Sequence, residues 1–267
     1  MNSPQTPALL QQLLPALQDL ASSYPGRGVA AWCAEILLDD LDENILPHDP
    51  LLPSIQKFLQ FLRGQSTDDP MVKGLAGYLL ARLSAIQGDF PSAFAATRNL
   101  RDWCKRWRGP VEEGLGLAFR AYVAPDSPTG ELLAANALKL VDDDLSIYAQ
   151  ITVRRRLSQL RQRLGGDAVT PLRQALERAR AEELQTIVLQ LLHDLSELPG
   201  YAGATEAARE ARGLATQLLR PRDEGRALLN LSVLSGQKQR WDRVTEVAEA
   251  LGSPVFRARV AAAGSAF

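Results

Sequence analysis

The stretch GYLLARLSAIQGDFPSAFAATRNL, residues 77–100, decides the fold because it joins two helical segments through one short turn. Apolar residues recur every three or four positions on both sides of that turn, which is the period of an amphipathic helix. Gly88 falls between the two segments, and helices commonly end next to a glycine with positive φ. Pro91 then stands in the first turn of the second segment, a position that proline favours. The stretch therefore predicts a pair of helices.

The rest of the chain repeats this helical pattern. Runs that alternate Val, Ile or Thr with polar residues do not occur, and Leu, Ala, Arg, Glu and Gln dominate, all of them good helix formers. Glycine and proline fall between the apolar-periodic blocks instead of inside them. We predict an all-α fold of about fourteen helices with no sheet. One of these helices is expected over residues 91–108.

From Met71 onward the predicted helices come in pairs. The turns inside the pairs follow one another at intervals of about 35 to 41 residues, which is the range of two-helix solenoid repeats. They fall near Gly88, Pro125, Gly165–Gly166, Gly200 and Gln239. Each pair alone would leave an apolar face open, and stacking on a neighbouring pair buries that face.

The opening stretch resembles the tetratricopeptide repeat (TPR) family. In that family a small residue on the first helix faces a small residue on the second, and a Gly-Asp-aromatic turn joins the two helices. Here Ala81 and Ala93 take the small positions, and Gly88-Asp89-Phe90 makes the turn. The resemblance implies an array of antiparallel helix pairs wound into a right-handed superhelix, or solenoid.

A second segment, residues 226–251, is similar to the family in fewer positions. Ser232 and Val244 take the small positions, Trp241 takes the aromatic position, and Gln239 stands where the turn glycine is expected. The pairs between these two segments keep the repeat length but lose most signature residues. The resemblance is therefore to the TPR-like superfamily.

Residues 1–70 fit no repeat. Their segment LLDDLDENILPHDPLLP, residues 37–53, interrupts the helical pattern with an acidic, proline-containing loop. We therefore predict an irregular helical N-terminal cap over residues 1–70 and a TPR-like array over residues 71–267, together forming one continuous domain. A separate small helical subdomain is the alternative for the first segment.

The segment RDWCKRWRGP, residues 101–110, places two tryptophans among four basic residues. On a helical wheel, Leu100, Trp103, Cys104 and Trp107 share one face of about 100°, the usual width of a buried stripe. Positive charge in a last helical turn is favoured by the helix dipole. Burial of the tryptophans explains the pattern, whereas a basic binding rim and a nucleic-acid surface are alternatives. The last one requires exposed rings.

A second basic segment, RRRLSQLRQRL at residues 154–164, has five arginines beside an apolar stripe. Arg154 and Arg161 flank one side of the stripe, and Arg156 and Arg163 flank the other. These side chains form either a solvated flank or a functional strip. If one flank lines a groove, Arg156 and Arg163 would attract carboxylates or phosphates bidentately. Arginine serves both kinds of ligand, so the segment does not separate a peptide groove from a phosphate groove.

Composition and charge narrow the function classes. The 267-residue chain has a formal net charge of −1, so no global field favours nucleic acid or an anionic membrane. Its two cysteines, Cys33 and Cys104, lie far apart and form no disulfide framework, which fits a reducing compartment. No apolar run approaches the roughly 18 residues of a membrane span. We expect a soluble, cytoplasmic protein.

The sequence carries no catalytic or cofactor-binding motif that we recognise. Two histidines, His48 and His193, and two distant cysteines cannot supply a Cys/His zinc site of usual spacing. The acidic loop at 39–43 lacks the glycine and final glutamate of an EF-hand. Phosphate-binding loops, nucleophile elbows and H-E-x-x-H are missing as well. We expect no catalytic residue, no metal site and no cofactor.

The residues that would line a groove follow from the first helix of each pair, counted from each turn. A one-residue register error would rotate a helix by about 100° and change the set. The predicted partner-binding residues are Tyr78, Arg82, Phe119, Tyr122, Arg156, Arg163, Gln190, His193, Arg226 and Asn230.

The TPR-like resemblance implies a non-catalytic scaffold that binds a peptide or protein segment on its concave face. The arginines and aromatic residues predict an acidic partner with apolar anchors. Free-standing TPR-like domains resemble the sensor regions of some bacterial regulators, which suggests bacterial signalling or transcription regulation. Nucleic-acid binding through the C-terminal arginines is the main alternative. A helical enzyme or small-ligand domain and self-association through an exposed apolar end are the others.

Overall fold

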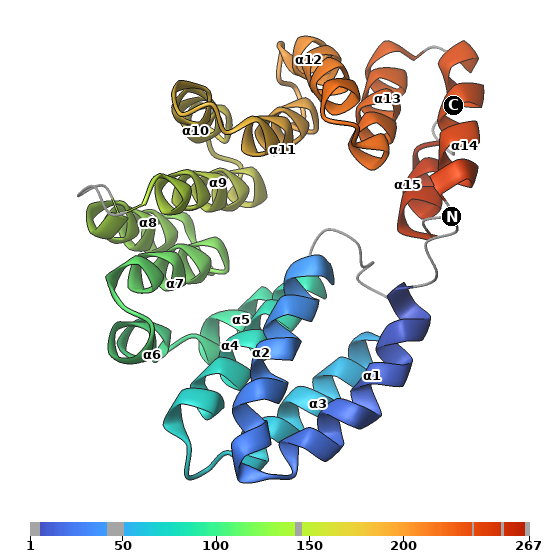
Figure 1. The fold of residues 1–267 in the computed structure, drawn as a ribbon. Helices are drawn as coiled ribbons and strands as arrows, with labels where there is room; N and C mark the ends of the chain where they lie inside the picture. Colours follow the sequence, from blue (N-terminus) through green and yellow to red (C-terminus); the bar gives the residue numbers. More distant parts are fainter. Residues whose placement is uncertain (1–5, 42–50, 142–145, 237, 252–253, 265–267) are drawn as a thin grey trace. The chain divides into compact units, whose positions relative to one another are not determined.

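A computed structural model describes residues 6–41, 51–141, 146–236, 238–251 and 254–264 (Figure 1). These residues form fifteen α-helices and no strand, which confirms the all-α prediction. None of these helices is long and apolar enough to cross a membrane. In chain order they are α1 (Thr6–Ala21), α2 (Tyr24–Leu41), α3 (Leu52–Gln65), α4 (Pro70–Ile86), α5 (Phe90–Ala96), α6 (Leu100–Trp107), α7 (Pro110–Tyr122), α8 (Ser127–Val141), α9 (Ile147–Leu164), α10 (Val169–Ala181), α11 (Gln185–Ser196), α12 (Ala204–Gln217), α13 (Pro221–Ser235), α14 (Lys238–Leu251) and α15 (Pro254–Gly264).

The turn between α4 and α5 has the geometry that the sequence predicts. Gly88 has φ of +80°, a conformation that other residues rarely adopt. The Asp89 carboxylate accepts a hydrogen bond from the Ser92 backbone N–H at 3.1 Å and so caps α5. Ala81 and Ala93 are both fully buried in one core cluster, so the helices approach closely on either side of this turn.

The single helix predicted over residues 91–108 is wrong, because the structure divides it into α5 and α6. At the break, the Thr97 hydroxyl donates to the Phe94 carbonyl oxygen at 2.8 Å. The Arg98 carbonyl oxygen accepts from Arg120 Nη1 on α7, also at 2.8 Å. A guanidinium from another helix thus holds the backbone at the break, and local helical periodicity contains no signal of that contact.

The helices form two compact units, Met1–Asp143 and Asp144–Phe267. In the first unit, α1, α2, α3 and α4 share one hydrophobic core that includes Phe58, Leu62 and Leu79. A further cluster joins α4 to α5, α6 and α7. The division between the two units therefore falls between Asp143 and Asp144.

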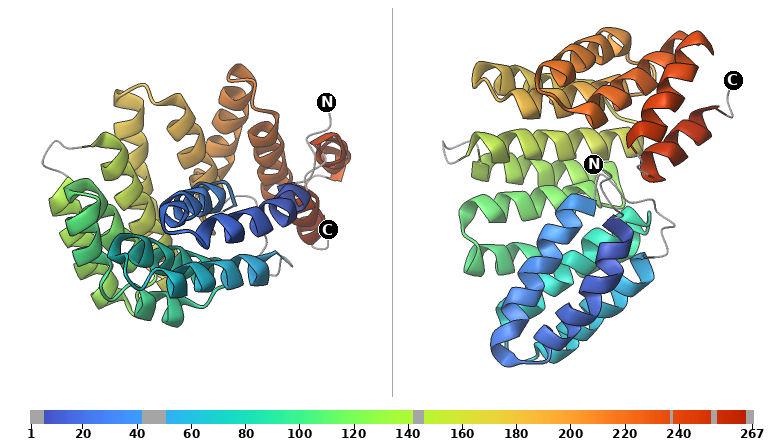
Figure 2. Two further views of the ribbon diagram at one scale, coloured as in Figure 1. Left: turned by 60° about the horizontal axis from the view of Figure 1, so that its bottom comes forward. Right: turned by 45° about the vertical axis from the view of Figure 1, so that its right-hand side comes forward.

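In the second unit, each helix packs on the next one along the chain (Figure 2). Its larger core is shared by α9, α10, α11, α12 and α13 and includes Leu172, Leu189 and Ala211. A smaller core joins α13, α14 and α15. By the pairing that the sequence predicts, α9, α11 and α13 are first helices, and α10 and α12 are second helices.

Helix α13 ends at a glycine, although the resemblance has Gln239 in the position of the turn glycine. Gly236 has φ of +61° and ends α13, so the left-handed residue lies three positions before Gln239. Gly165 and Gly200, predicted as turn positions, also have positive φ. A glycine with positive φ therefore ends α13 three positions before the predicted turn.

Candidate partner-binding site

Four of the predicted residues come together in the first unit. The Tyr78 and Phe119 rings meet edge to face with centroids 5.4 Å apart, and Phe119 lies 6.3 Å from Tyr122. The Arg82 guanidinium lies 5.9 Å from the Tyr78 ring centroid. Phe119 is 3% exposed and Arg82 is 6% exposed, so these two residues belong to the core. The partly exposed tyrosines are the members that a partner can reach.

The tryptophans of residues 101–110 take different environments. Trp103 Nε1 donates to the Met71 carbonyl oxygen of α4 at 3.1 Å, and Cys104 is 4% exposed. Trp107 is 40% exposed, with the Arg106 guanidinium 5.1 Å from its ring centroid. The buried stripe is therefore confirmed at Cys104 and in part at Trp103, and is wrong at Trp107, because α6 ends there.

Two basic residues of this segment form ion pairs inside the first unit. Arg101 Nε donates to Glu113 Oε1 at 2.7 Å. Arg108 makes a two-pronged contact with Glu35 of α2, at 3.2 and 3.1 Å. These ion pairs connect α6 to α7 and α2, so Arg101 and Arg108 already have partners within the first unit.

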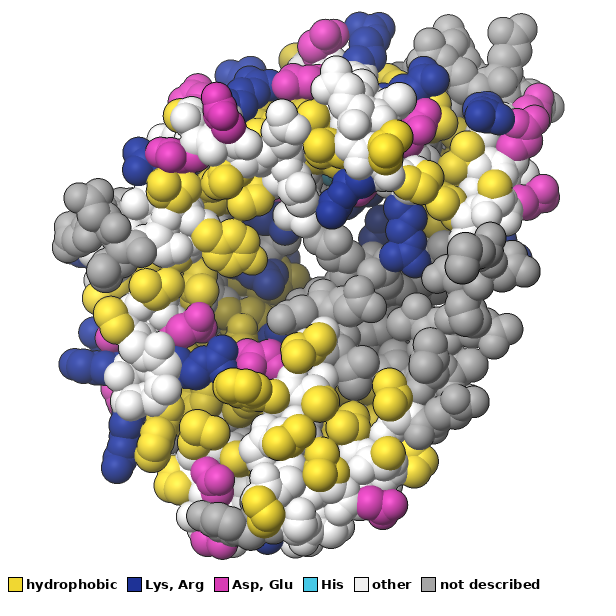
Figure 3. All heavy atoms as spheres, viewed as in Figure 1, with side chains coloured by type: hydrophobic (Ala, Val, Ile, Leu, Met, Phe, Trp, Pro, Cys, Tyr) yellow, Lys and Arg dark blue, Asp and Glu magenta, His cyan; other side chains and the backbone are white. Residues whose placement is uncertain are grey.

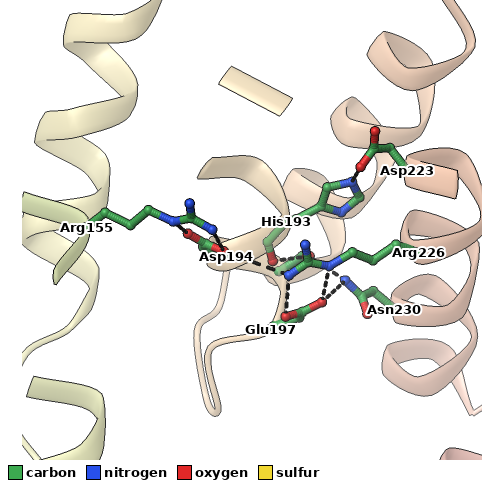
Figure 4. A network of polar contacts seen from close by, with 8 residues as sticks. Arg155, His193, Asp194, Glu197, Asp223, Arg226 and Asn230 are labelled. Carbon is green, nitrogen blue, oxygen red and sulfur yellow. Dashed lines mark hydrogen bonds and ion pairs between the residues drawn. The ribbon is translucent and has the colours of Figure 1, made fainter. Parts of the chain in front are cut away.

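In the second unit, α11 and α13 bring together His193, Arg226 and Asn230 of the predicted set (Figure 4). Arg226 donates from Nε and Nη2 to the two carboxylate oxygens of Glu197, at 2.7 and 2.8 Å. Asn230 Nδ2 donates to Ser196 Oγ at 2.8 Å and to Glu197 Oε1 at 3.3 Å. Arg226 and Asn230 are one turn apart on α13, so both reach the end of α11.

Asp194 extends this network to a third helix. Arg155 of α9 donates from Nε and Nη2 to the two Asp194 carboxylate oxygens, the latter at 3.1 Å. Arg226 Nη2 lies 3.8 Å from Asp194 Oδ1 on the other side. Charges therefore alternate from Arg155 through Asp194 and Arg226 to Glu197, across α9, α11 and α13. We call these four residues the charge row.

The charge row keeps the Glu197 carboxyl ionised. Burial acts to raise the pKa of Glu197, but the hydrogen bonds and charge of Arg226 act against it. The Asn230 amide and the Arg259 charge add to this effect, and the pKa lies below its ordinary value. The Glu197 side chain is 39% exposed, so an ionised carboxylate is presented to solvent in a fixed position.

His193 lies beside the charge row in a different environment. Its side chain is 0% exposed, and Nε2 lies 3.6 Å from Asp223 Oδ1, beyond hydrogen-bonding distance. Burial, with the nearby Arg226 charge, lowers the pKa of His193 to about 3, against an opposing effect of Glu197. The imidazole is therefore neutral at physiological pH and fills space between α11 and α13.

Three other predicted residues lie on the same helices. Arg156 donates to Gln159 Oε1 of its own helix at 3.0 Å. Arg163 and Gln190 are partly exposed on α9 and α11. None of these three is among the residues labelled in Figure 4.

Sequence reasoning missed Arg155, Asp194, Glu197 and Asp223. Arg155 precedes the predicted Arg156, and one residue turns a helix by 100°. Asp194 and Glu197 carry a usable signal, because they stand three residues apart on one helix face. Their partner Arg226 was predicted on the first helix of the following pair. Matching acids to bases between successive first helices would have found the charge row.

Neither metal-site geometry nor similarity to known proteins assigns a chemistry to this site. Within the described ranges, no group of three or more His, Cys, Asp or Glu is placed to hold a metal ion. No protein-family model matches the chain, and no curated protein matches it either.

Proposed function

We propose that this protein is a non-catalytic interaction module whose second unit binds a protein segment along α9, α11 and α13. The charge row is the observation that supports this proposal, because its ion pairs hold hydrogen-bonding groups in place on three helices before a partner binds. A preorganised surface loses less conformational freedom on binding. The row also ties successive helix pairs together, so part of its role is structural.

The arrangement of helix pairs supports a TPR-like solenoid as the fold. Gly88 has the positive φ and Ala81 the burial that a TPR-like turn requires. In the second unit, first helices contact one another through the charge row while second helices pack between them in the chain order. We propose a right-handed superhelix on this basis, with α9, α11 and α13 lining its concave face.

Apolar anchor points flank the charge row. Tyr148 lies two turns before Arg155 on α9 and is 60% exposed. Val233 lies two turns after Arg226 on α13 and is 48% exposed. Residues seven apart share a helix face, so these side chains belong to the same surface as the row. A partner segment with apolar side chains at its ends would bury both.

The charge row revises the partner chemistry expected from the arginines. Arg226 already contacts two carboxylates, so an acidic segment would compete with Asp194 and Glu197 for it. Glu197 is the most exposed member of the row and is ionised. We therefore propose a partner that donates hydrogen bonds or a positive charge to Glu197. A bacterial, cytoplasmic signalling or transcription setting rests on the TPR resemblance alone.

Capture of a partner from lysate, followed by charge reversal, tests this function. Tagged wild-type protein and an R226E variant are compared with an R209E variant. Arg209 is a suitable control because it is exposed on α12 and pairs with Glu206 of the same helix. We expect a specific partner to bind wild-type and R209E, with binding to R226E weakened by at least about tenfold, the effect typical of a hot-spot residue. Equal binding to all three folded proteins would contradict the site.

A nuclease-treated arm of the same experiment separates protein from nucleic acid. A protein partner survives nuclease and keeps most of its affinity as salt rises. A nucleic-acid ligand disappears with nuclease, and its binding falls steeply with salt because phosphate contacts release counterions. The second result would overturn the proposal and direct mutagenesis to Arg156 and Arg163.

A further inference from the structure

The second unit contains a cavity of about 660 Å³ that shares no residue with the charge row. It is lined by the end of α10, the start of α11 and the second half of α12. Its volume falls within the range of roughly 300–1,000 Å³ that is typical of small-ligand sites. Figure 3 shows acidic and basic side chains mixed over the place that α10, α11 and α12 occupy in Figure 1.

Glu183 lines this cavity and has a backbone conformation that favours glycine. It follows α10 with φ of +54°, and the Leu184 backbone N–H closes the turn by donating to the Ala179 carbonyl oxygen at 2.9 Å. At five other described positions with positive φ the chain has glycine, and only Leu219 shares the exception. An outlier of this kind points to a role for the side chain itself.

Gly213 shows the opposite choice in the wall of the same cavity. It lies inside α12, where glycine is less favourable than alanine. A Cβ at this position would meet nothing within 4 Å, so packing does not require glycine here. The chain therefore has a side chain where the backbone favours glycine, and glycine where the helix favours a side chain. Both choices shape one cavity, because the first adds a carboxylate to it and the second leaves it open.

The charged groups of the cavity leave one carboxylate without a counter-ion. Arg180 of α10 pairs with Glu210 of α12. The Glu183 carboxylate forms no ion pair and no hydrogen bond with another residue of the described ranges. One basic and two acidic residues therefore give the lining a formal charge of −1. Val188, which is 7% exposed, and Leu214 add apolar surface. The occupant that suits this lining is a single positive charge on an apolar chain.

We propose that this cavity binds an arginine side chain, with its guanidinium against Glu183 and its methylene groups over Val188 and Leu214. A guanidinium is planar and pairs with a carboxylate through two N–H donors at once. The methylene groups of arginine cover apolar surface while the charged end stays in a polar setting. The arginine belongs either to a protein or to the free amino acid, since both present the same side chain. The site does not depend on the function proposed for the charge row.

Chemical-shift titration of the isotope-labelled full chain tests the site, with N-acetyl-argininamide and free L-arginine as probes. N-acetyl-citrullinamide is the matched control, because it has nearly the same shape and no charge. We expect N-acetyl-argininamide or L-arginine to shift the backbone amide signals of Glu183, Gln185 and Gly213. The citrulline probe should bind at least about tenfold more weakly, since a hydrogen bond between charged groups is the stronger one. Preference for N-acetyl-argininamide would identify a protein as the source of the arginine, and preference for L-arginine would identify the free amino acid.

Variants at the two unusual positions supply a second measurement. E183Q removes the charge, and E182Q is its control, because Glu182 is exposed beside it and does not line the cavity. E183G and G213L should melt at or above the wild-type temperature, because glycine suits positive φ and leucine suits a helix interior. E183Q, E183G and G213L should nevertheless bind the arginine probes at least about tenfold more weakly than wild type. E182Q should bind them as wild type does.

Several results would overturn the proposal. One is that neither arginine probe shifts the signals of the cavity residues in the wild-type protein. Another is that the citrulline probe binds equally well, or that E183Q keeps wild-type affinity. Equal losses in E182Q and E183Q would also overturn it, because negative charge near the turn, and not the cavity, would then attract the probe.

Discussion

His193 illustrates how one side chain links the packing of α11 and α13 to solution conditions. The ring is fully buried, and neither of its nitrogens makes a hydrogen bond with the described residues. Burial lowers the pKa of His193 to about 3 from an ordinary value of 6.5. In the unfolded chain the same ring takes up a proton below pH 6.5. The unfolded state therefore binds more protons between these values, and acid favours unfolding.

We predict that stability falls between pH 6.5 and pH 5 because of His193. A depressed histidine pKa costs up to about 1.4 kcal/mol for each pH unit below the unfolded value, so the loss is about 1–2 kcal/mol over this window. Glu197 contributes only at lower pH, because its folded pKa lies below the ordinary carboxyl value. Urea unfolding of wild-type protein at several pH values measures the slope.

A pair of histidine variants assigns that slope. H193L removes the titrating group and should flatten the dependence above pH 5. H48L is measured beside it, because His48 is the other histidine of the sequence. An unchanged slope in H193L would show that some other group causes it.

Single residues mark the limit of sequence-based site prediction. Arg226 and Asn230 were predicted and meet at Glu197, because they stand one turn apart on one face of α13. On α9 the same counting favoured Arg156, while the salt bridge to Asp194 is made by Arg155. On a helical wheel Arg156 flanks the apolar stripe of α9, whereas Arg155 lies on the opposite side of the helix, so the apolar periodicity does not point to Arg155. Only the position of α11 against α9 decides between them.

At the scale of the element, α4 contains two glycines with opposite surroundings. A Cβ on Gly74 would lie 2.0 Å from Trp103 Cδ1, since α6 packs directly on this point. A Cβ on Gly77 would meet nothing within 4 Å. Packing against Trp103 requires glycine at position 74, whereas glycine at position 77 only lowers the stability of the helix.

We predict opposite effects for the two alanine variants of α4. G74A should destabilise the protein by about 1–3 kcal/mol, because the Trp103 ring must move. G77A should stabilise it by about 0.5–1 kcal/mol, since alanine is the better helix former. Chemical denaturation of both variants measures the difference. Equal effects would show that Trp103 does not pack against Gly74 as described.

Element boundaries were predictable where a local residue sets them. Gly88 and Gly165 end helices through positive φ, and both were identified from the sequence. The break between α5 and α6 was missed because Arg120 holds the Arg98 carbonyl from a different helix. Gly236 was missed for another reason, because the repeat pattern places the turn glycine at position 239, where this sequence has Gln. Local chemistry was sufficient in the first cases, and tertiary contact or exact register was needed in the others.

On the scale of the whole molecule, the predicted partner-binding residues are divided between the two compact units. The cluster of Tyr78, Phe119 and Tyr122 lies in Met1–Asp143, and the charge row lies in Asp144–Phe267. The repeat intervals predicted from Met71 onward continue past residue 143 and do not mark a division there. A division that depends on which helices share a core is not visible in sequence periodicity.

We propose that the charge row binds a partner in addition to holding helices together, and exchanging the two charges of Arg226 and Glu197 separates these roles. R226E and E197R each place like charges together, and the double variant restores an opposite pair between α11 and α13. Binding of the captured partner and thermal melting are measured for all three. We predict that the double variant melts above both single variants but still binds the partner at least about tenfold more weakly than wild type. Recovery of both wild-type binding and wild-type stability would contradict the proposed binding role, because the charge row would then serve only to hold α11 and α13 together.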